Sequence, residues 1–305
     1  MNRTSTGPRI ALATCAAFPA LAPDDQLLGE ALAARGARPQ PVVWDDAAVA
    51  WGEFDACLVR SVWDYHFKHE GFLVWARRVG GILPLWNGPE LLAWNSEKAY
   101  LRELEGRGIA TIPTEWIGRG GEAQLSELLA ARGWEEAVVK PTVDLGALNL
   151  RRVHGGGNGI DQIALEGLLV HHDVMVQPFL PAIEAEGETS LIYVGGELSH
   201  AVRKRPKRGD FRVQPSWGGS VDAVQPSATE LEAAARALAA LDTTPLYARV
   251  DLVAGDAGEP LLIELELIDP HLFLGERPET TAALADSVLA RLATADRRRR
   301  RSRCP

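Results

Sequence analysis

The chain has 305 residues, 46% of them hydrophobic and 24% charged, and a net charge of -9 from 32 Lys+Arg and 41 Asp+Glu. This length and composition are typical of a globular protein with two or three domains, each with a buried core. The negative charge argues against a nucleic-acid-binding protein, which usually carries a basic surface, and no apolar run approaches the 18 residues of a membrane-spanning helix.

The first 90 residues show alternating strand and helix patterns. Strands are expected at 8–14, 39–44 and 55–62, and helices at 24–36 and about 70–79. This β-α-β order predicts an open parallel sheet. Because no G-x-G-x-x-G follows the first strand, the sequence excludes a dinucleotide-binding fold.

The pattern changes after a helical stretch at 88–108. Short strands and helices follow, and then a hairpin over 189–204 that turns near Gly195 and Gly196. We expect a loop rich in Gly, Pro and Arg over 205–227, then a helix, and then a second hairpin about the turn GDAGEP. Antiparallel hairpins among helices predict an α+β fold for this part of the chain.

The second hairpin carries three carboxylates. In LLIELELIDP, Glu264 and Glu266 point to one face of the strand, whereas Ile263 and the two leucines after it point to the other. Asp251 of the preceding strand lies at a similar distance from the turn. Like charges this close raise one another's pKa unless a cation lies between them, and oxygen ligands suit magnesium or manganese. The alternative interpretation is an amphipathic strand with one solvated face.

Two lysines and one strand end also allow a functional and a structural interpretation. Lys98 lies in WNSEKAY, and Lys140 ends the apolar strand EAVVKP, before a loop whose backbone N–H groups can cover phosphates. The structural alternative is a surface lysine whose head group reaches solvent. The strand end at 177–180 is either a hinge that offers backbone groups to an adenine, with Glu184 for a ribose, or a connector between subdomains.

Six short motifs follow one another along the chain. They are N-x-x-K, V-V-K-P with a small-residue loop, V-Q-P-F-L with a downstream G-E-T-S, R-K-R-P-K-R-G-D-F-R-V-Q with G-G, A-R-V-D, and I-E-L-E-L-I-D-P. In this order they resemble the ATP-grasp superfamily, although no single motif is specific. With R-S-V-W-D-Y, they are similar to the branch that contains bacterial glutathione synthetase and the O-ureido-serine cyclo-ligase that forms cycloserine.

The resemblance covers nearly the whole chain and implies an ATP-grasp fold with α/β and α+β parts. An N-terminal open parallel-sheet domain precedes a small central α+β domain and a C-terminal α+β domain, and ATP is expected between the last two. The implied boundaries are 1–95 for the substrate domain, 96–180 for the central nucleotide subdomain, 181–296 for the C-terminal subdomain with the magnesium site, and 297–305 for a basic disordered tail.

The resemblance also implies roles for the matching residues. The residues expected to hold ATP are Lys98 and Lys140 at the phosphates, Gln177, Pro178, Phe179 and Leu180 at the adenine, and Glu184 at the ribose. Magnesium, with manganese as the alternative, is expected at Asp251, Glu264 and Glu266. Arg203 and Arg212 are expected to face the transferred phosphoryl group and the acceptor carboxylate. The expected substrate contacts are Arg60, Ser61, Asp64, Tyr65, Gly218 and Gly219.

Three features depart from the pattern of the superfamily. Glu266 stands where most members have Asn, and a carboxylate there still suits magnesium. Asp144 and Leu150 lie in the phosphate loop, where an anion is unfavourable unless it binds metal or points away. His271 follows the I-D-P motif near the expected substrate edge, with an ordinary loop histidine as the alternative.

The implied activity is ATP-dependent joining of a small amino-acid-like carboxylate to an amine, through an acyl phosphate, with release of ADP and phosphate. The amine belongs to a second molecule or to the same one, in which case a ring closes. The resemblance implies a homodimer that acts in antibiotic or other specialised-metabolite biosynthesis. We expect the protein in the cytoplasm, because the three cysteines show no metal-ligand or disulfide pattern. The alternatives are a non-catalytic nucleotide-binding descendant, suggested by Asp144 and Leu150, and a ligase that acts on a peptide terminus.

Overall fold

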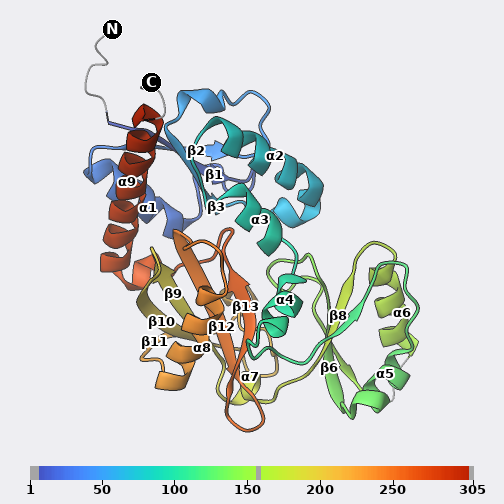
Figure 1. Cartoon of the computed structure of the whole chain (residues 1–305). Coiled ribbons are helices and arrows are strands. Elements are labelled where there is room, and N and C mark those ends of the chain that lie inside the picture. Colours follow the sequence, from blue (N-terminus) through green and yellow to red (C-terminus); the bar gives the residue numbers. More distant parts are fainter. Residues whose placement is uncertain (1–6, 156–158, 302–305) are drawn as a thin grey trace.

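A computed structural model describes residues 7–155 and 159–301 of the chain. The strands form three sheets, built in turn from the N-terminal, central and C-terminal parts of the sequence (Figure 1). One sheet is parallel and the other two are antiparallel, which confirms the predicted combination of α/β and α+β parts. None of the described helices has both the length and the apolar character that crossing a membrane requires.

The N-terminal sheet is parallel throughout, as predicted. Its strand order is β2 (Arg38–Val43), β1 (Arg9–Thr14), β3 (Ala56–Ser61) and β4 (Leu85–Trp86). The helices of this part are α1 (Pro23–Ala34), α2 (His69–Ile82) and α3 (Pro89–Asn95). Because consecutive β1, β2 and β3 run in the same direction, the carboxyl ends of these strands lie at one edge of the sheet, close to the C-terminal part.

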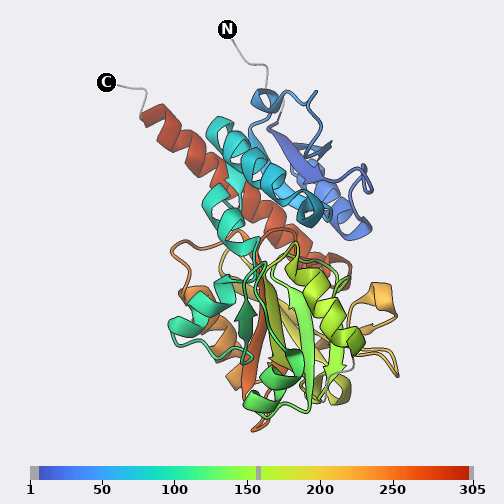
Figure 2. The ribbon, with the colours of Figure 1, turned by 90° about the vertical axis from the view of Figure 1, so that its right-hand side faces the viewer.

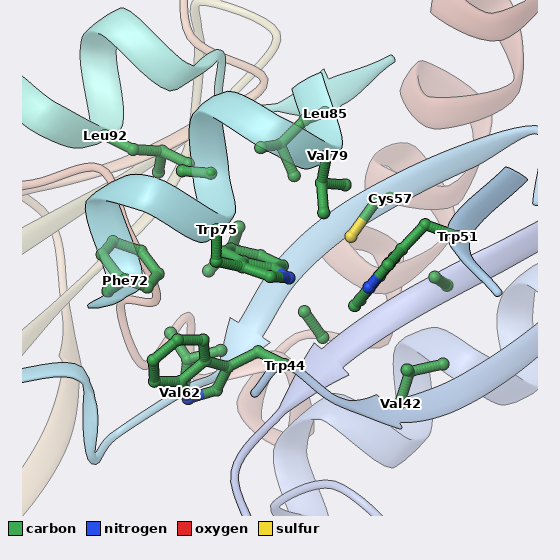
Figure 3. Packing of buried hydrophobic residues seen from close by; sticks show 14 of the residues in the cluster. Val42, Trp44, Trp51, Cys57, Val62, Phe72, Trp75, Val79, Leu85 and Leu92 are labelled. Carbon is green, nitrogen blue, oxygen red and sulfur yellow. The ribbon is translucent and has the colours of Figure 1, made fainter. Parts of the chain in front are cut away.

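Aromatic side chains fill the space between this sheet and α2. Figure 3 shows Trp44, Trp51 and Phe72 around Trp75, with Cys57 of β3 beside Trp51. The ring of Trp75 lies 5.8 Å from that of Trp44 and 5.6 Å from that of Trp51, both near edge-to-face. Buried rings in this geometry contribute packing energy beyond the apolar area they bury, so they fix α2 on the sheet.

The central part is a four-stranded antiparallel sheet covered by two helices. Its strand order is β5 (Glu115–Ile117), β8 (Val174–Pro178), β6 (Glu136–Pro141) and β7 (Arg151–His154). The helices α5 (Leu125–Arg132) and α6 (Gly159–Leu169) pack on one face through Leu125, Leu129, Leu165 and Leu169. The loop at 142–150 joins β6 to β7 at the end of the sheet nearest the C-terminal part.

The C-terminal sheet has five antiparallel strands. Their order is β11 (Ser220–Val224), β10 (Glu197–Arg205), β9 (Glu188–Val194), β12 (Tyr247–Ala254) and β13 (Pro260–Glu266). Helices α4 (Tyr100–Gly106) and α8 (Ala228–Ala239) pack against one face. On the other face, Ile192 and Val194 pack with the N-terminal part and the C-terminal helix, and charged residues occupy the rest. The two predicted hairpins are confirmed, and the glycine pair at 195 and 196 turns the first with positive φ angles.

The predicted loop over 205–227 is wrong in part, because it contains β11. This strand pairs with β10 at the edge of the sheet. Its sequence, SVDAV, is short and half-polar, so its apolar pattern is too weak to identify it. The remaining short elements are α7 (Ala182–Ala185) and four 3₁₀ helices, at Trp51–Glu53, Tyr65–Lys68, Pro215–Trp217 and Leu274–Glu276.

A β-bulge in β13 corrects the predicted orientation of Ile263. Asp251 pairs with Glu264 but Leu252 pairs with Leu262, so Ile263 is the extra residue. Ile263 therefore does not share the core face with Leu265, and it packs with Leu180 and its neighbours instead. The bulge places Ile263 on the same side as the glutamates without disturbing the core.

The C-terminal helix α9 (Pro278–Arg301) returns to the N-terminal part of the molecule (Figures 1 and 2). Its Leu284 and Val288 pack with Leu28 and Leu32 of α1, in the cluster that also joins β1 to β9. The helix extends through 297–301, so the expectation of a disordered tail is wrong for these residues. Arg is a good helix former and nothing in the run interrupts the helix. Residues 302–305 of the expected tail lie outside the described residues.

Candidate active site

The carboxylates predicted from the second hairpin converge on the face of the C-terminal sheet opposite α4 and α8. Asp251 of β12 pairs with Glu264 of β13, and one oxygen from each of Asp251, Glu264 and Glu266 lies within 4.8 Å of the others. Asp251 is buried, and the two glutamates are partly exposed. Period-two alternation brings Glu264 and Glu266 to the same face, which confirms the predicted convergence.

Positive side chains neutralise this cluster. The Nη2 atom of Arg249 lies 2.9 Å from Asp251 Oδ2 and also pairs with Glu266. Lys204 Nζ lies 3.4 Å from Asp251 Oδ2 and pairs with Glu188. Sequence analysis assigned no role to Arg249, Lys204 or Glu188. The signal was present, because Arg249 is two residues before Asp251 and therefore shares its face.

Burial and neighbouring charges shift the pKa values of the cluster in opposite directions. Burial raises the pKa of Glu266 to about 7, with Glu264 adding to the rise and Arg249 opposing it. Burial also acts to raise the pKa of Asp251, but Arg249 and Lys204 outweigh it and lower that pKa. An additional positive charge between these carboxylates therefore stabilises their ionised forms.

The two predicted phosphate lysines lie beside the carboxylates. Lys98 Nζ is 3.0 Å from Glu264 Oε1 and donates a 2.8 Å hydrogen bond to the backbone oxygen of Asp144. Lys140 is 7% exposed at the end of β6, where burial and the charge of Lys98 lower its pKa to about 8. The structure thus brings both lysines, the 142–150 loop and the carboxylates together.

Asp144, the unexpected anion of the loop, has a local partner. Its Oδ1 accepts a 3.2 Å hydrogen bond from Asn149 Nδ2, and the residue is 6% exposed. Burial raises its pKa, which favours the neutral form. The hydrogen bond from Asn149 holds this carboxyl group within the loop. Leu150 is partly buried at the end of the same loop.

The predicted adenine hinge lies between the central and C-terminal sheets. Gln177 donates a 2.9 Å hydrogen bond to Thr114, and Pro178 ends β8. Leu180 packs with Val253 and Leu261, and Phe179 contacts Phe211 with ring centroids 5.9 Å apart. This forms an apolar wall next to the strand end, as an adenine requires. Glu184, predicted for a ribose, is ion-paired with Arg152 at 2.7 Å.

The structure does not place Arg203 with the carboxylates. On β10, Arg203 bonds Thr189 and Glu230 on the face covered by α8, whereas Lys204 points to Asp251. Adjacent residues of a strand point to opposite faces, so Lys204, and not Arg203, lies with the carboxylates.

Arg212 lies in a loop that reaches the central part of the molecule. Its guanidinium stacks 3.5 Å from the ring centroid of Trp217, and Trp217 Nε1 donates a 3.0 Å hydrogen bond to Gly146 O of the 142–150 loop. Gly218 has a φ of +86°, and a Cβ on Gly219 would lie 2.2 Å from a backbone oxygen. The two glycines thus shape the turn that presents Trp217, and their expected contact with substrate stays a prediction.

The predicted substrate residues of the N-terminal part divide into two groups. Arg60 and Ser61 are 1% and 0% exposed and both bond Asp25, so they lie behind the surface, and their expected contact with substrate stays a prediction. Asp64 accepts a 2.8 Å hydrogen bond from Trp44 Nε1. Tyr65, in contrast, lines a cavity of about 20 Å³ together with Glu264 and Glu266.

His271 lies at the edge of this region. Its ring nitrogen is 3.7 Å from Asp24, and its backbone oxygen accepts a 3.3 Å hydrogen bond from Arg249. The backbone of His271 thus helps to orient Arg249, which pairs with the carboxylates. Burial lowers the pKa of the imidazole, which favours its neutral form at pH 7.

Two family models match separate parts of the chain. Residues 10–87 match the N-terminal domain of D-cycloserine synthetase DcsG, and residues 110–270 match the ATP-grasp domain of prokaryotic glutathione synthetase. The first match covers the parallel sheet and Tyr65. The second covers the central sheet, the hinge and all three carboxylates.

Whole-chain relatives agree with these matches. The cycloserine biosynthesis protein DcsG of Streptomyces lavendulae is 30% identical over 260 residues, which are 82% of this chain and 87% of that protein. A glutathione synthetase of Prochlorococcus marinus is 35% identical over 216 residues, 70% of this chain and 65% of that protein.

Solved structures extend the similarity to the fold. The crystal structure of D-cycloserine synthetase DcsG superposes with a TM-score of 0.86 at 30% identity, over 93% of this chain and 99% of that one. D-alanine–D-alanine ligase of Bacillus anthracis, solved with ATP, shares the fold at 16% identity and a TM-score of 0.68, over 96% of this chain and 100% of that one. The chain therefore belongs to the ATP-grasp family and is one of its ADP-forming, C–N-bond-forming ligases.

Proposed function

We propose that this ligase activates the carboxylate of a small amino-acid-like substrate with ATP and closes a ring by attack of an amine nitrogen of the same molecule, in antibiotic biosynthesis. The observation that carries this proposal is that two parts of the chain, each similar to a different ligase, contribute residues to one site. The glutathione-synthetase-like part supplies the lysines and carboxylates, and the cycloserine-synthetase-like part supplies the wall that contains Tyr65.

The donor set fits a divalent metal and a triphosphate. Three carboxylates with oxygens within 4.8 Å of one another are hard ligands of the kind that Mg²⁺ prefers, so Asp251, Glu264 and Glu266 are the residues that would hold it. When bound, magnesium neutralises charge on the phosphates. Lys98 and Lys140 supply positive charge at the same place, next to the backbone of the 142–150 loop.

The reaction follows from the chemistry of the site. A carboxylate oxygen of the substrate attacks the γ-phosphorus of ATP, the bond to the β–γ bridging oxygen breaks, and ADP leaves. The amine nitrogen then attacks the acyl carbon, phosphate leaves with the electron pair of the C–O bond, and the nitrogen loses a proton. Arg249 and Lys204, which are held by the carboxylate cluster, are placed to stabilise the charge of the transferred phosphoryl group.

The match over residues 10–87 favours ring closure over joining of two molecules, since that part of the chain resembles a cycloserine synthetase and contributes Tyr65 to the cavity beside the carboxylates. No observation favours a peptide terminus as the acceptor, because the peptide-binding ligases among the similar structures share only the fold, at 15–17% identity. The homodimer, the cytoplasmic location and the domain boundaries remain predictions.

Calorimetric titration with ATP, with and without Mg²⁺, tests the nucleotide site. We expect binding to require Mg²⁺ and Glu264→Gln to weaken it at least about tenfold, since a hydrogen-bonded charge contributes about 1.5–3 kcal/mol. Glu259→Gln is the control, because Glu259 is an exposed carboxylate in the turn of the same hairpin. Equal affinities of the two variants for ATP would contradict the metal site.

Mass spectrometry then separates the two reaction types. With a single candidate acid that carries its own amine, ring closure yields ADP and a product lighter than the acid by one water. Joining of two molecules yields a product heavier than either reactant. ADP release that requires a second amine compound would overturn the intramolecular proposal and retain the ligase.

A further inference from the structure

An arginine of the central sheet lies at the junction between the central and C-terminal parts of the molecule. Arg152 belongs to β7 and pairs with Val138 of β6. Directly paired residues of an antiparallel sheet share a face, and so do residues two apart on one strand, so Arg152 lies on the same face as Lys140. Its neighbour Val153 points to the opposite face, where α5 and α6 pack. Arg152 therefore faces the side on which the nucleotide is expected.

Three groups hold the guanidinium of Arg152. Its Nε donates a 3.2 Å hydrogen bond to Glu136 Oε2, and its Nη1 donates one of 2.7 Å to Glu184 Oε1. Its Cζ lies 3.6 Å from the ring centroid of Phe179. The backbone N–H of Phe179 donates in turn to Glu136 O at 2.9 Å. Because the guanidinium is a planar fork that is engaged at several points, its position is fixed in advance.

The two carboxylates that bind Arg152 belong to different parts of the molecule. Glu136 begins β6 of the central sheet, whereas Glu184 lies on α7, whose Ile183 packs in the cluster that contains Val253 of the C-terminal sheet. Arg152 thus bridges the two parts across the predicted hinge. Partly exposed ion pairs contribute little to stability, so the main effect of this bridge is to set the position of Glu184.

The oxygens of the two carboxylates are engaged to different extents. Both oxygens of Glu136 are in use, because His154 Nδ1 lies 2.7 Å from Oε1 and Arg152 binds Oε2. Glu184 is bound through Oε1, and none of the hydrogen bonds among the described residues uses its Oε2. Its side chain is 45% exposed. An ionised carboxylate oxygen only accepts hydrogen bonds, so the group that Oε2 can bind is a donor such as a hydroxyl.

We propose that Arg152 is a positioning residue for the nucleotide, which holds Glu184 so that its Oε2 accepts hydrogen bonds from the ribose hydroxyls. This rests on the proposed function, because it requires ATP in the site. A free glutamate side chain loses rotamer freedom when it binds a ligand, and a side chain already held by Arg152 avoids most of that loss. Ribose binding at Glu184 then also connects the C-terminal part to the central sheet through the same arginine.

Calorimetry with two nucleotides tests this assignment without turnover. The probes are a non-hydrolysable ATP analogue and its 2′,3′-dideoxy counterpart, each with Mg²⁺. We expect the wild type to bind the first at least about tenfold more tightly. Arg152→Met keeps an apolar cover on the ring of Phe179. It should reduce the preference to about threefold or less, while the affinity for the dideoxy nucleotide changes less than about twofold.

The next residue on the same strand provides the matched control. Arg151 points to the opposite face of the sheet and pairs with Asp161 of α6 at 3.2 Å. Arg151→Met removes the same charge one residue away and leaves Glu184 in place. We therefore expect this variant to keep the full wild-type preference for the nucleotide that carries the ribose hydroxyls.

A double-mutant cycle shows whether Arg152 acts through Glu184. Glu184→Gln alone should lose the preference, and the addition of Arg152→Met should change it no further. Arg152→Lys is the second variant at this position, because a single ammonium does not reproduce the fork that joins Glu136 and Glu184. It should retain less than half of the wild-type preference.

Several results would overturn the inference. They are an undiminished preference in Arg152→Met or Arg152→Lys, additive effects in the cycle, and equal binding of the two nucleotides by the wild type. Equal weakening of both nucleotides by Arg152→Met would also overturn it and would assign this residue a purely structural role. If Arg152→Met does not fold, Arg152→Lys decides. Failure of the wild type to bind either nucleotide with Mg²⁺ contradicts the proposed function instead, so the two failures are distinguishable.

Discussion

Lys140 shows how a single buried residue combines a cost in stability with a role in binding. Its ammonium is 7% exposed at the end of β6, and burial together with Lys98 lowers its pKa from 10.5 to about 8. A buried cation that lacks full compensation destabilises the fold, whereas the same cation attracts a triphosphate. The pattern V-V-K-P in the sequence indicated this conflict, because a charged residue interrupted an apolar strand.

We expect Lys140→Met to weaken ATP binding at least tenfold at pH 7 and to raise the free energy of unfolding, by at most about 3 kcal/mol.

The pKa of Lys140 is lower in the folded than in the unfolded state, so the unfolded chain binds more protons between about pH 8 and 10.5. The free energy of unfolding of the wild type therefore rises as the pH rises through that window, whereas that of the variant does not show this rise. Urea denaturation at pH 7 and pH 9.5 measures it, with exposed Lys207→Met as the control. An unchanged pH slope in Lys140→Met would contradict the burial argument.

Residue-level prediction succeeded where a local pattern carried the information. Glu264 and Glu266 interrupt an apolar strand at a spacing of two, so the sequence alone placed them on one face with a partner across the hairpin. The burial of Arg60 and Ser61 could not be predicted, because a motif identifies a position but does not reveal that Asp25, 35 and 36 residues away, binds both side chains in the interior.

At the scale of the element, β10 decides which of two neighbouring cations serves the site. Lys204 faces Asp251 and Glu188, and Arg203 faces Glu230 on the opposite side of the sheet. We expect Lys204→Met to lower kcat/KM at least about tenfold, through loss of positive charge beside the phosphoryl group. Arg203→Met is the matched control. Its partly exposed ion pair contributes about 1 kcal/mol or less to stability, and kcat/KM should change less than twofold.

Both variants are compared by the steady-state kinetics of ADP release, with a substrate that the mass-spectrometry experiment has identified. A larger loss in Arg203→Met than in Lys204→Met would restore the original assignment. The sequence could not decide between the two residues, because R-K-R places a cation on both faces of the strand whichever register the strand takes. A one-residue change in register exchanges the faces, and only pairing with β9 and β11 fixes the register.

Across the whole molecule, Tyr247 and Asn87 join the N-terminal sheet to the C-terminal one. The Tyr247 hydroxyl lies 2.5 Å from Val59 O and 3.0 Å from Ile268 O. The Asn87 side chain bonds Leu246 N, Tyr247 O and Leu267 O at 2.7–3.0 Å. These bonds hold the strand ends of the N-terminal sheet, and hence the wall with Tyr65, against the carboxylate face.

We expect Tyr247→Phe to lower the free energy of unfolding by about 1–3 kcal/mol, since buried carbonyl oxygens lose their donor. Nucleotide affinity should stay within twofold. Tyr193→Phe is the control, because Tyr193 is also buried in the C-terminal sheet and none of the hydrogen bonds described uses its hydroxyl. Chemical denaturation of both variants provides the comparison, and equal losses would show that the hydroxyl of Tyr247 does not connect the two sheets.

The sequence by itself determined the features that depend on local periodicity and short motifs. These are the parallel N-terminal sheet, the two hairpins, and the convergence of Asp251 with Glu264 and Glu266. Tertiary structure decided the neutralisation by Arg249 and Lys204, the bulge at 263, and the cavity at Tyr65. The physical reason is that alternation sets which way a side chain points, whereas its charge partners and its burial depend on contacts between segments that are far apart in the chain.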